Sequence, residues 1–333
     1  MTQTVVITGA SAGVGRAVAR HYAARGARLA LIARGAAGLA AAARDCRERG
    51  AAEVSTHQLD VADAGAVHRA ADEVAHRWGA LDVWINNAMV SVLAPAWEIP
   101  ADEYRRVTEV NYLGTVYGTL AALRHMRAHA RGAIVQVGSA LAYRGIPLQS
   151  AYCASKHAIQ GFNDSLRAEL LHDCPGVTLS MVQLPAVNTP QFSWMRTRLP
   201  RHPQPVPPIF APEVAARAIV WAADRGPREL NVGGPTWKAR LGDTFFPGLL
   251  DRKLARDGYD SQQTETPIDR AAWRDNLDQP GDADRDRGAE GVFTDRARGS
   301  SAALWVGTHK PAVTAAGLGV LALALGGLAR RRR

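Results

Sequence analysis

The chain has 333 residues, of which 47% are hydrophobic and 21% charged, and its formal net charge is +9. This apolar fraction predicts a globular protein with a sizeable buried core and excludes a disordered chain. Four positive charges form the terminal run Arg330 to Arg333 and the other basic residues are scattered, which argues against nucleic-acid binding. The three cysteines lack metal-ligand spacing, so no metal site or disulfide framework is expected.

The N-terminal segment MTQTVVITGAS lacks the basic region of a signal peptide and leads directly into a strand pattern. We therefore expect the fold to begin at residue 2. The few cysteines fit a reducing compartment, for which we expect the cytoplasm.

Short aliphatic runs alternate with Ala-rich helical stretches from residue 4 to about 235. This pattern predicts an α/β fold with a doubly wound, seven-stranded parallel sheet of the Rossmann type, covered by helices on both faces. Helix ends are expected at Gly26, Gly50 and Gly79, and the domain is expected to span residues 1–250. The seven expected strands are TVVITG, RLALIAR, EVSTHQLD, LDVWINN, GAIVQVGS, VTLSMVQL and ELNVGG.

The segment VVITGASAGVGRA predicts a first strand, a glycine-rich turn and a helix. Gly9, Gly13 and Gly15 allow a sharp turn and a close approach to a pyrophosphate, which the helix N-terminus attracts. No Lys-Ser or Lys-Thr pair follows these glycines, so a P-loop is excluded. The segment predicts a dinucleotide site.

The second expected strand ends in LIARG, with Ala33 and Arg34 where an acid would hold a ribose 2′-hydroxyl. An arginine at this place accommodates a 2′-phosphate, which favours NADP(H) over NAD(H). Arg16 either adds a second cation there or is simply solvated. Asp60, which closes the third strand, is placed to meet the adenine edge or to cap the next helix.

The segment YCASK places Tyr152 and Lys156 four residues apart, on one side of a helix. Taken alone, such a pair is common on solvated helix faces. Ser139 ends a strand thirteen residues earlier and Asn111 precedes it, although a strand cap and a polar helix residue would explain these two as well. Tyr143 also follows Ser139 but has no lysine four residues on, so we do not expect it to act in place of Tyr152.

Residues 188–214 are rich in proline yet contain Phe192, Trp194 and Met195. A loop at the carboxyl edge of such a sheet is where substrate pockets form, so we interpret it as a pocket lid, with Trp194 at the substrate. The alternative is packing against a neighbouring subunit, which leaves a homo-oligomer open.

Residues 251–310 mix acidic and basic residues with few aliphatics, which predicts a polar linker or peripheral extension. In the last segment, 311–333, residues 312–329 carry no charge and would reach about 27 Å as a helix. The polar segment before them and the arginines after them argue against a buried helix, so we expect a membrane attachment. Whether this helix spans or lies on the membrane stays open, because spanning would place the arginines outside.

Together these motifs resemble the short-chain dehydrogenase/reductase family over residues 4 to about 235. TGASAGVG is similar to the family's Thr-Gly-x3-Gly-x-Gly turn, and YCASK to its Tyr-x3-Lys. VNYLG and VQVGS carry the family's Asn and Ser. NNAM has Met89 and LPAVNT has Ala186 where the family has glycine.

The resemblance implies hydride transfer between a nicotinamide and a carbonyl or alcohol carbon, with Tyr152 as acid/base. It also implies that Lys156 favours the phenolate and holds ribose, that Ser139 binds the substrate oxygen, and that Asn111 holds a relay water. The implied catalytic residues are Asn111, Ser139, Tyr152 and Lys156, and the implied substrate residues are Ser139, Tyr152 and Trp194. The implied cofactor-binding residues are Gly9, Ser11, Gly13, Val14, Gly15, Arg34, Asp60, Val61, Asn87, Ala88, Tyr152, Lys156, Pro185, Val187 and Thr189.

We therefore expect an NADP-dependent oxidoreductase that acts, as a reductase, on the carbonyl or alcohol group of a fairly hydrophobic small molecule. The alternative is a membrane-tethered NADP-binding scaffold or sensor with little turnover, which would have no use for Ser139 and Tyr152. A sugar-nucleotide epimerase is a weaker alternative, and the glycine spacing argues against it.

Overall fold

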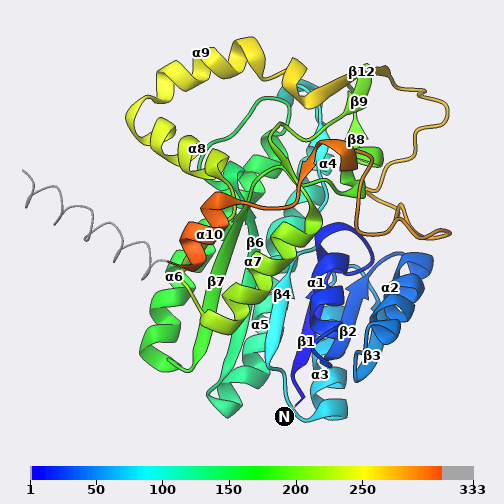
Figure 1. Ribbon diagram of the computed structural model, residues 1–333, viewed down its shortest axis with the longest axis vertical. Coiled ribbons are helices and arrows are strands. Elements are labelled where there is room, and N and C mark those ends of the chain that lie inside the picture. The colour runs from blue at the N-terminus through cyan, green and yellow to red at the C-terminus, as the bar shows by residue number, and fades with distance from the viewer. Residues whose placement is uncertain (1, 310–333) are drawn as a thin grey trace, which may run out of the picture.

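The structure is a computed structural model that describes residues 2–309. Its centre is a seven-stranded sheet in the order β11-β7-β6-β4-β1-β2-β3, and every neighbouring pair of these strands is parallel. The predicted sheet is thus confirmed (Figure 1). The strands are β1 (Thr4–Thr8), β2 (Arg28–Ala33), β3 (Glu53–Gln58), β4 (Val83–Asn86), β6 (Gly132–Ser139), β7 (Val177–Leu184) and β11 (Glu229–Asn231).

Helices cover both faces of this sheet (Figure 1), which explains why its central strands are continuous apolar runs. One face packs against α1 (Gly13–Ala23), α2 (Ala36–Glu48) and α7 (Pro212–Arg225). The other packs against α3 (Ala64–Trp78), α5 (Gly114–Met126) and α6 (Ser150–Asp173). Gly26, Gly50 and Gly79, expected at helix ends, all have positive φ, and Gly79 is the left-handed cap of α3.

The strand order reverses at β1, which has β2 on one side and β4 on the other. Because consecutive connections leave this point in opposite directions, a crevice opens at the carboxyl ends of these strands. The fold therefore places the loops after β1 and β4 where a dinucleotide site is expected.

Smaller elements surround that crevice. A short helix, α4 (Ala101–Val107), leads into a π-helical turn (Thr108–Leu113), and a helical hairpin follows the sheet. Three strand pairs join the loops: β5 with β8, β9 with β12, and β10 with β13. Their bounds are β5 (Val92–Leu93), β8 (Arg196–Thr197), β9 (Arg201–Pro203), β10 (Ile209–Phe210), β12 (Gln263–Pro267) and β13 (Ala297–Arg298), and the remaining helices are α8 (Gly234–Phe245), α9 (Pro247–Asp257) and α10 (Ala302–Thr308).

The C-terminal extension differs from the expected linker. Residues 268–293, called the strap below, run along the carboxyl edge of the sheet beside α2 (Figure 1). Leu277 is fully buried, and Ala289 and Phe293 are also buried, so a few apolar residues anchor an otherwise polar segment. Such sparse anchors leave the mean hydropathy of the segment low, which is why its composition predicted no packed structure.

Within residues 2–309, every helix is too short or too polar to cross a bilayer. The hydrophobic helix predicted in residues 311–333 lies outside the part of the chain that the structure describes.

Candidate active site

A cavity of about 430 Å³ opens at the carboxyl edge of the sheet. The loops after β1, β2, β4, β6 and β7 line it, and residues of α6, α8 and the strap complete its walls. Its position is the crevice that the strand order creates, so fold and cavity agree on one site.

The glycine turn after β1 forms one end of this cavity. Gly9 and Gly13 have φ of 64° and 56°, and a Cβ added to Gly15 would lie 2.2 Å from the Gly9 carbonyl oxygen. The N-cap residue of α1, Ala12, makes no side-chain hydrogen bond to the helix. The Gly13 amide donates to the Gly288 carbonyl oxygen of the strap, whereas the amides of Val14 and Gly15 keep their capacity for a ligand. A bare turn at a helix N-terminus fits the pyrophosphate of a dinucleotide.

The segment after β4 is tied to this turn. Thr8 Oγ1 accepts hydrogen bonds from the amides of Asn87 (2.9 Å) and Ala88 (3.1 Å). The Asn87 side chain donates to the carbonyl oxygens of Thr8 (3.0 Å) and Gly9 (3.2 Å). The loops on the two sides of the crevice are thereby fixed relative to one another.

Ser139, Tyr152 and Lys156 meet on the opposite wall. Ser139 is the last residue of β6, and the other two lie in the first two turns of α6. Lys156 Nζ donates to the Val137 carbonyl oxygen at 2.8 Å and lies 5.5 Å from the centroid of the Tyr152 ring. Ser139 Oγ accepts from the Leu141 amide at 3.1 Å, which leaves its hydroxyl hydrogen free to donate.

Burial shifts the pKa values of Tyr152 and Lys156 in opposite directions. Burial raises the pKa of Tyr152 well above its usual range, and the hydrogen bond from Ser139 acts in the opposite direction with a smaller effect. Burial also lowers the pKa of Lys156 to about 8. In the cofactor-free protein, burial therefore favours the neutral phenol of Tyr152. The expected role of Lys156, which is to favour the phenolate beside a bound nicotinamide, stays a prediction.

Asn111 lies apart from the cavity lining, in the π-helical turn. Its Oδ1 accepts from the Val90 amide at 2.8 Å, and its Nδ2 donates to the Val90 carbonyl oxygen and to Ser155 Oγ, both at 3.0 Å. These bonds use both amide hydrogens, so the side chain positions Val90 and the first turns of α6. The expected role of Asn111 with a relay water stays a prediction.

Most of the expected cofactor residues line the cavity. Gly15 does not, because it packs behind the turn against Gly9. Met89 and Ala186, which replace family glycines, are on the cavity wall as well. The expected cofactor residues found on the wall are Gly9, Ser11, Gly13, Val14, Arg34, Asp60, Val61, Asn87, Ala88, Tyr152, Lys156, Pro185, Val187 and Thr189.

The charged groups at the nucleotide end are already engaged with protein atoms. Arg34 Nη1 donates to the carbonyl oxygens of Leu277 (3.1 Å) and Asp278 (3.0 Å), and Nη2 donates to that of Asn276. Asp60 pairs with Arg106 and accepts from the Ala62 amide, so it caps the turn after β3 rather than helix α3. Asp63 is the N-cap of that helix.

Arg16 is neither solvated nor a cofactor cation, the two roles that the sequence left open. It is buried, its Nε donates to Asp45 at 2.9 Å, and its Nη1 lies 3.4 Å from Asp286 of the strap. Two carboxylates therefore neutralise it behind the glycine turn.

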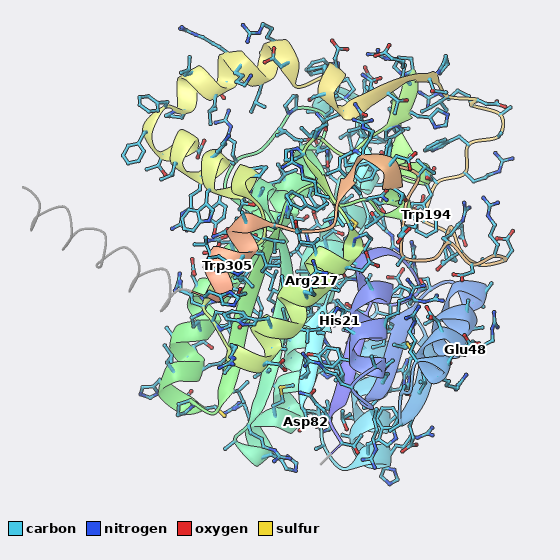
Figure 2. The ribbon with its side chains drawn as sticks, in the orientation of Figure 1. His21, Glu48, Asp82, Trp194, Arg217 and Trp305 are labelled. Atoms are coloured by element: carbon cyan, nitrogen blue, oxygen red, sulfur yellow. The ribbon has the colours of Figure 1, made fainter. Side chains whose placement is uncertain are left out.

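The loop at residues 188–214 lines the substrate side, as its aromatic residues predicted. Trp194 is buried beside the strap (Figure 2), and its Nε1 donates to Gln191 Oε1 at 3.2 Å. Tyr143 is absent from the lining, and the Arg240 guanidinium covers its ring.

Sequence reasoning missed the part of the wall that comes from residues after 235. Pro235 and Ala239 come from α8, and Gly281 and Asp282 come from the strap. The only available signal was the paired glycines of RGAAG, because glycine marks places where another chain segment approaches closely. That signal does not say which segment approaches.

A family model described as short chain dehydrogenase matches residues 3–198. The uncharacterized oxidoreductase YxnA of Bacillus subtilis is 32% identical over 267 residues, which cover 80% of this chain and 75% of that protein. Dehydrogenase/reductase SDR family member 7B of Bos taurus is 41% identical over 182 residues, covering 53% of this chain and 56% of that protein. The chain thus matches only about half of the length of this second relative.

A solved structure supports the same likeness. An alcohol dehydrogenase from the archaeon Thermococcus sibiricus, complexed with 5-hydroxy-NADP, aligns with a TM-score of 0.59 and 28% identity. The alignment covers 69% of this chain and 96% of that one. The family model ends at residue 198, so the strap lies outside it.

Proposed function

The chain belongs to the short-chain dehydrogenase family, and we propose that it reduces the carbonyl group of an uncharged, hydrophobic small molecule. Membership makes it an NAD(P)-dependent oxidoreductase. The residues of the cavity support the proposed substrate class and the proposed direction of the reaction.

The distribution of charge in the cavity carries the substrate class. The charged residues of its lining are Arg34, Asp60, Asp282 and Lys156, of which the first three lie at the nucleotide end. The substrate side is lined by apolar residues and uncharged polar ones. A carboxylate or phosphate on the substrate would find no partner there, whereas an apolar ketone or aldehyde would be desolvated at little cost. The lining on this side is Ser91, Leu141, Ile146, Gln149, Gln191, Phe192, Trp194, Met195, Gln204, Val206, Pro207, Pro235 and Ala239.

The catalytic wall supplies the groups that a carbonyl oxygen needs. A nicotinamide, when bound, supplies the hydride; Lys156 would hold its ribose. The Ser139 hydroxyl donates a hydrogen bond to the substrate oxygen, and Tyr152 donates its phenolic proton to the same atom. Ser139 is close enough to Tyr152 to influence its pKa, so both hydroxyls lie on the same part of the wall.

The protonated phenol of Tyr152 suits the reduction step, which is the direction that we propose. A phenol that is protonated at neutral pH can donate a proton, whereas oxidation of an alcohol needs the phenolate. Buried Lys156, whose pKa is lowered to about 8, contributes less positive charge to the phenolate above that pH.

The NADP(H) preference predicted from Ala33 and Arg34 stays a prediction. Arg34 lines the cavity, and its charge supports a 2′-phosphate at the nucleotide end. However, its N–H groups already donate to carbonyl oxygens of the strap, and a carboxylate of the strap lies nearby. Both features disfavour a 2′-phosphate.

We also propose that residues 311–333 attach the protein to a membrane, with the catalytic domain in the cytoplasm. Leu241, Phe245, Phe246 and Leu249, exposed apolar residues of the α8–α9 hairpin, support an apolar neighbour. Fractionation of the full chain and of a chain ending at residue 310 tests this. A full chain that stays entirely in the soluble fraction would refute the attachment.

A panel of matched carbonyl compounds tests the substrate class, with apolar ketones and aldehydes set against keto acids of the same size. We expect NAD(P)H oxidation with the apolar members, and a loss of about 10²- to 10⁴-fold in kcat in Tyr152→Phe with unchanged cofactor affinity. Tyr143→Phe is the matched control and should keep full activity. Cofactor binding without turnover of any compound would favour the scaffold alternative, and faster reduction of keto acids would refute the substrate class.

A further inference from the structure

The strap closes over the nucleotide end of the cavity through main-chain bonds. The amides of Ala37 and Gly38, in the first turn of α2, donate to the carbonyl oxygens of Ala283 (3.2 Å) and Asp282 (3.0 Å). The Gly13 amide of the glycine turn donates to the Gly288 carbonyl oxygen at 3.0 Å. The strap is therefore bonded to both loops that surround this end of the cavity.

Asp282 is the residue that these bonds bring into the cavity wall. It is 5% exposed, and its Oδ2 has no hydrogen-bond partner among residues 2–309. A buried carboxylate oxygen without a partner is costly, so its presence in a cavity wall points to a ligand with a hydrogen to donate.

Two glycines make room for this carboxylate. A Cβ added to Gly35 would lie 1.9 Å from Asp282 Oδ1, and one added to Gly38 would lie 2.1 Å from Oδ2. The Cβ of Ser11, in the glycine turn, is 3.0 Å from that same added atom on Gly38. The carboxylate therefore fills a space between the turn after β1 and the start of α2. A side chain at position 35 or 38 would close this space.

This space is where the adenosine ribose of a dinucleotide is bound in the doubly wound fold. An acid at the end of the second strand normally holds the ribose 2′-hydroxyl there. In this chain that strand ends in Ala33, which has no carboxylate. Asp282 of the strap packs against Gly35, two residues after Ala33 in the loop that follows β2. The missing acid is thus present in space but comes from a segment about 250 residues away.

The surroundings stabilise the carboxylate as an anion. It lies at the N-terminal end of α2, where the helix dipole favours a negative charge, and the positive charge of Arg34 is close enough to interact with it. Arg34 in turn has both Nη1 hydrogens and one Nη2 hydrogen in bonds to strap carbonyls. A 2′-phosphate would have to displace these bonds and would face the charge of Asp282.

We propose that Asp282 accepts a hydrogen bond from the adenosine ribose 2′-hydroxyl and discriminates against a 2′-phosphate, so that the strap sets the cofactor choice of this enzyme. The proposal rests on the dinucleotide site of the proposed function. Asp282 disfavours NADP(H), whereas the charge of Arg34 favours it. The ratio of the affinities for NADH and NADPH measures which effect is larger.

Equilibrium titration of the full chain with NADH and NADPH, followed by the fluorescence of the bound nucleotide, tests the proposal without turnover. Asp282→Asn keeps the size of the side chain and removes its charge. We expect the ratio of Kd for NADPH to Kd for NADH to fall about tenfold or more, because a hydrogen bond to a charged acceptor is lost and a repulsion is relieved. Asp286→Asn, which removes a strap carboxylate that faces Arg16 behind the turn, should leave the ratio unchanged.

The outcomes separate the proposal from the function on which it rests. A ratio that changes less than about twofold in Asp282→Asn, or that changes equally in Asp286→Asn, would overturn the role of Asp282 while leaving the dinucleotide site intact. Failure of all three proteins to bind either nucleotide would overturn both. A thermal-unfolding scan of each variant confirms that the affinities compared are those of folded protein.

Discussion

The glycine turn and the strap lie on the same end of the cavity, yet only the turn is recognisable in the sequence. The turn acts through its own backbone, because Gly9, Gly13 and Gly15 leave the amides of α1 accessible to a phosphate. The strap acts through one side chain whose position depends on bonds to distant segments. A function carried by local backbone geometry leaves a motif, whereas a function carried by tertiary placement leaves none.

Substituting one glycine in the turn and one in the strap tests this difference between the two regions. The larger loss of cofactor affinity is expected in the turn. A Cβ on Gly15 would lie 2.2 Å from the Gly9 carbonyl oxygen and 2.6 Å from the side-chain nitrogen Nδ2 of Asn87. The backbone cannot relieve these clashes without a costly shift. We expect Gly15→Ala to weaken NADH binding about a hundredfold or more, equivalent to losing two charge-assisted hydrogen bonds to the pyrophosphate. Titration with NADH measures this loss.

Gly281→Ala is the corresponding change in the strap. Its Cβ would lie 2.5 Å from the Trp194 ring, so the strap must shift. This shift would weaken only the proposed hydrogen bond that Asp282 accepts from the ribose 2′-hydroxyl. We expect a loss of about tenfold or less in NADH affinity. Gly161→Ala, where an added Cβ meets nothing within 4 Å, is the control. Equal losses in the two regions would contradict the contrast.

The sequence predicted what repeats along the chain or depends on local spacing. All seven strands and their parallel pairing were predictable, because alternating apolar runs and helices admit few other arrangements. The common wall of Ser139, Tyr152 and Lys156 was also predictable, since β6 and the first turns of α6 must meet at the carboxyl edge.

The remainder depends on packing that no local pattern encodes. Burial raises the pKa of Tyr152, and spacing alone does not reveal burial. The sequence left Arg16 open as a second cation or a solvated residue, whereas in the fold Asp45 and Asp286 pair with it. Asp282 lies in a segment whose composition resembles a linker, so only the fold identifies it.

A change at the anchor of the strap tests whether this region is separable from the rest of the fold. Leu277 is fully buried against the sheet, and truncation of such a residue costs about 2–5 kcal/mol. We expect Leu277→Ala to open the strap locally, because the segment has few other buried apolar residues. Limited proteolysis should then cleave within residues 268–293 while the remaining fragment stays folded.

The control for this experiment is Leu171→Ala, which truncates an exposed leucine on α6. It should leave the cleavage pattern and the thermal midpoint unchanged. Loss of the whole domain in Leu277→Ala, without earlier cleavage in the strap, would show that strap and sheet unfold as one unit.

On the predicted wall, Lys156 makes the free energy of unfolding depend on pH. Its pKa of about 8 in the folded protein lies below the 10.5 of a free lysine side chain, so the unfolded chain binds more protons between these values. The free energy of unfolding should therefore rise from pH 8 to about pH 10.5, and the cost of the buried charge is fully present below pH 8. Lys156→Met should remove this rise and stabilise the cofactor-free protein at pH 7 by about 2 kcal/mol, after allowance for the lost bond to Val137. Urea unfolding at several pH values measures it, with the exposed Lys253→Met as control; a steeper rise in Lys156→Met than in the parent chain would contradict the assignment.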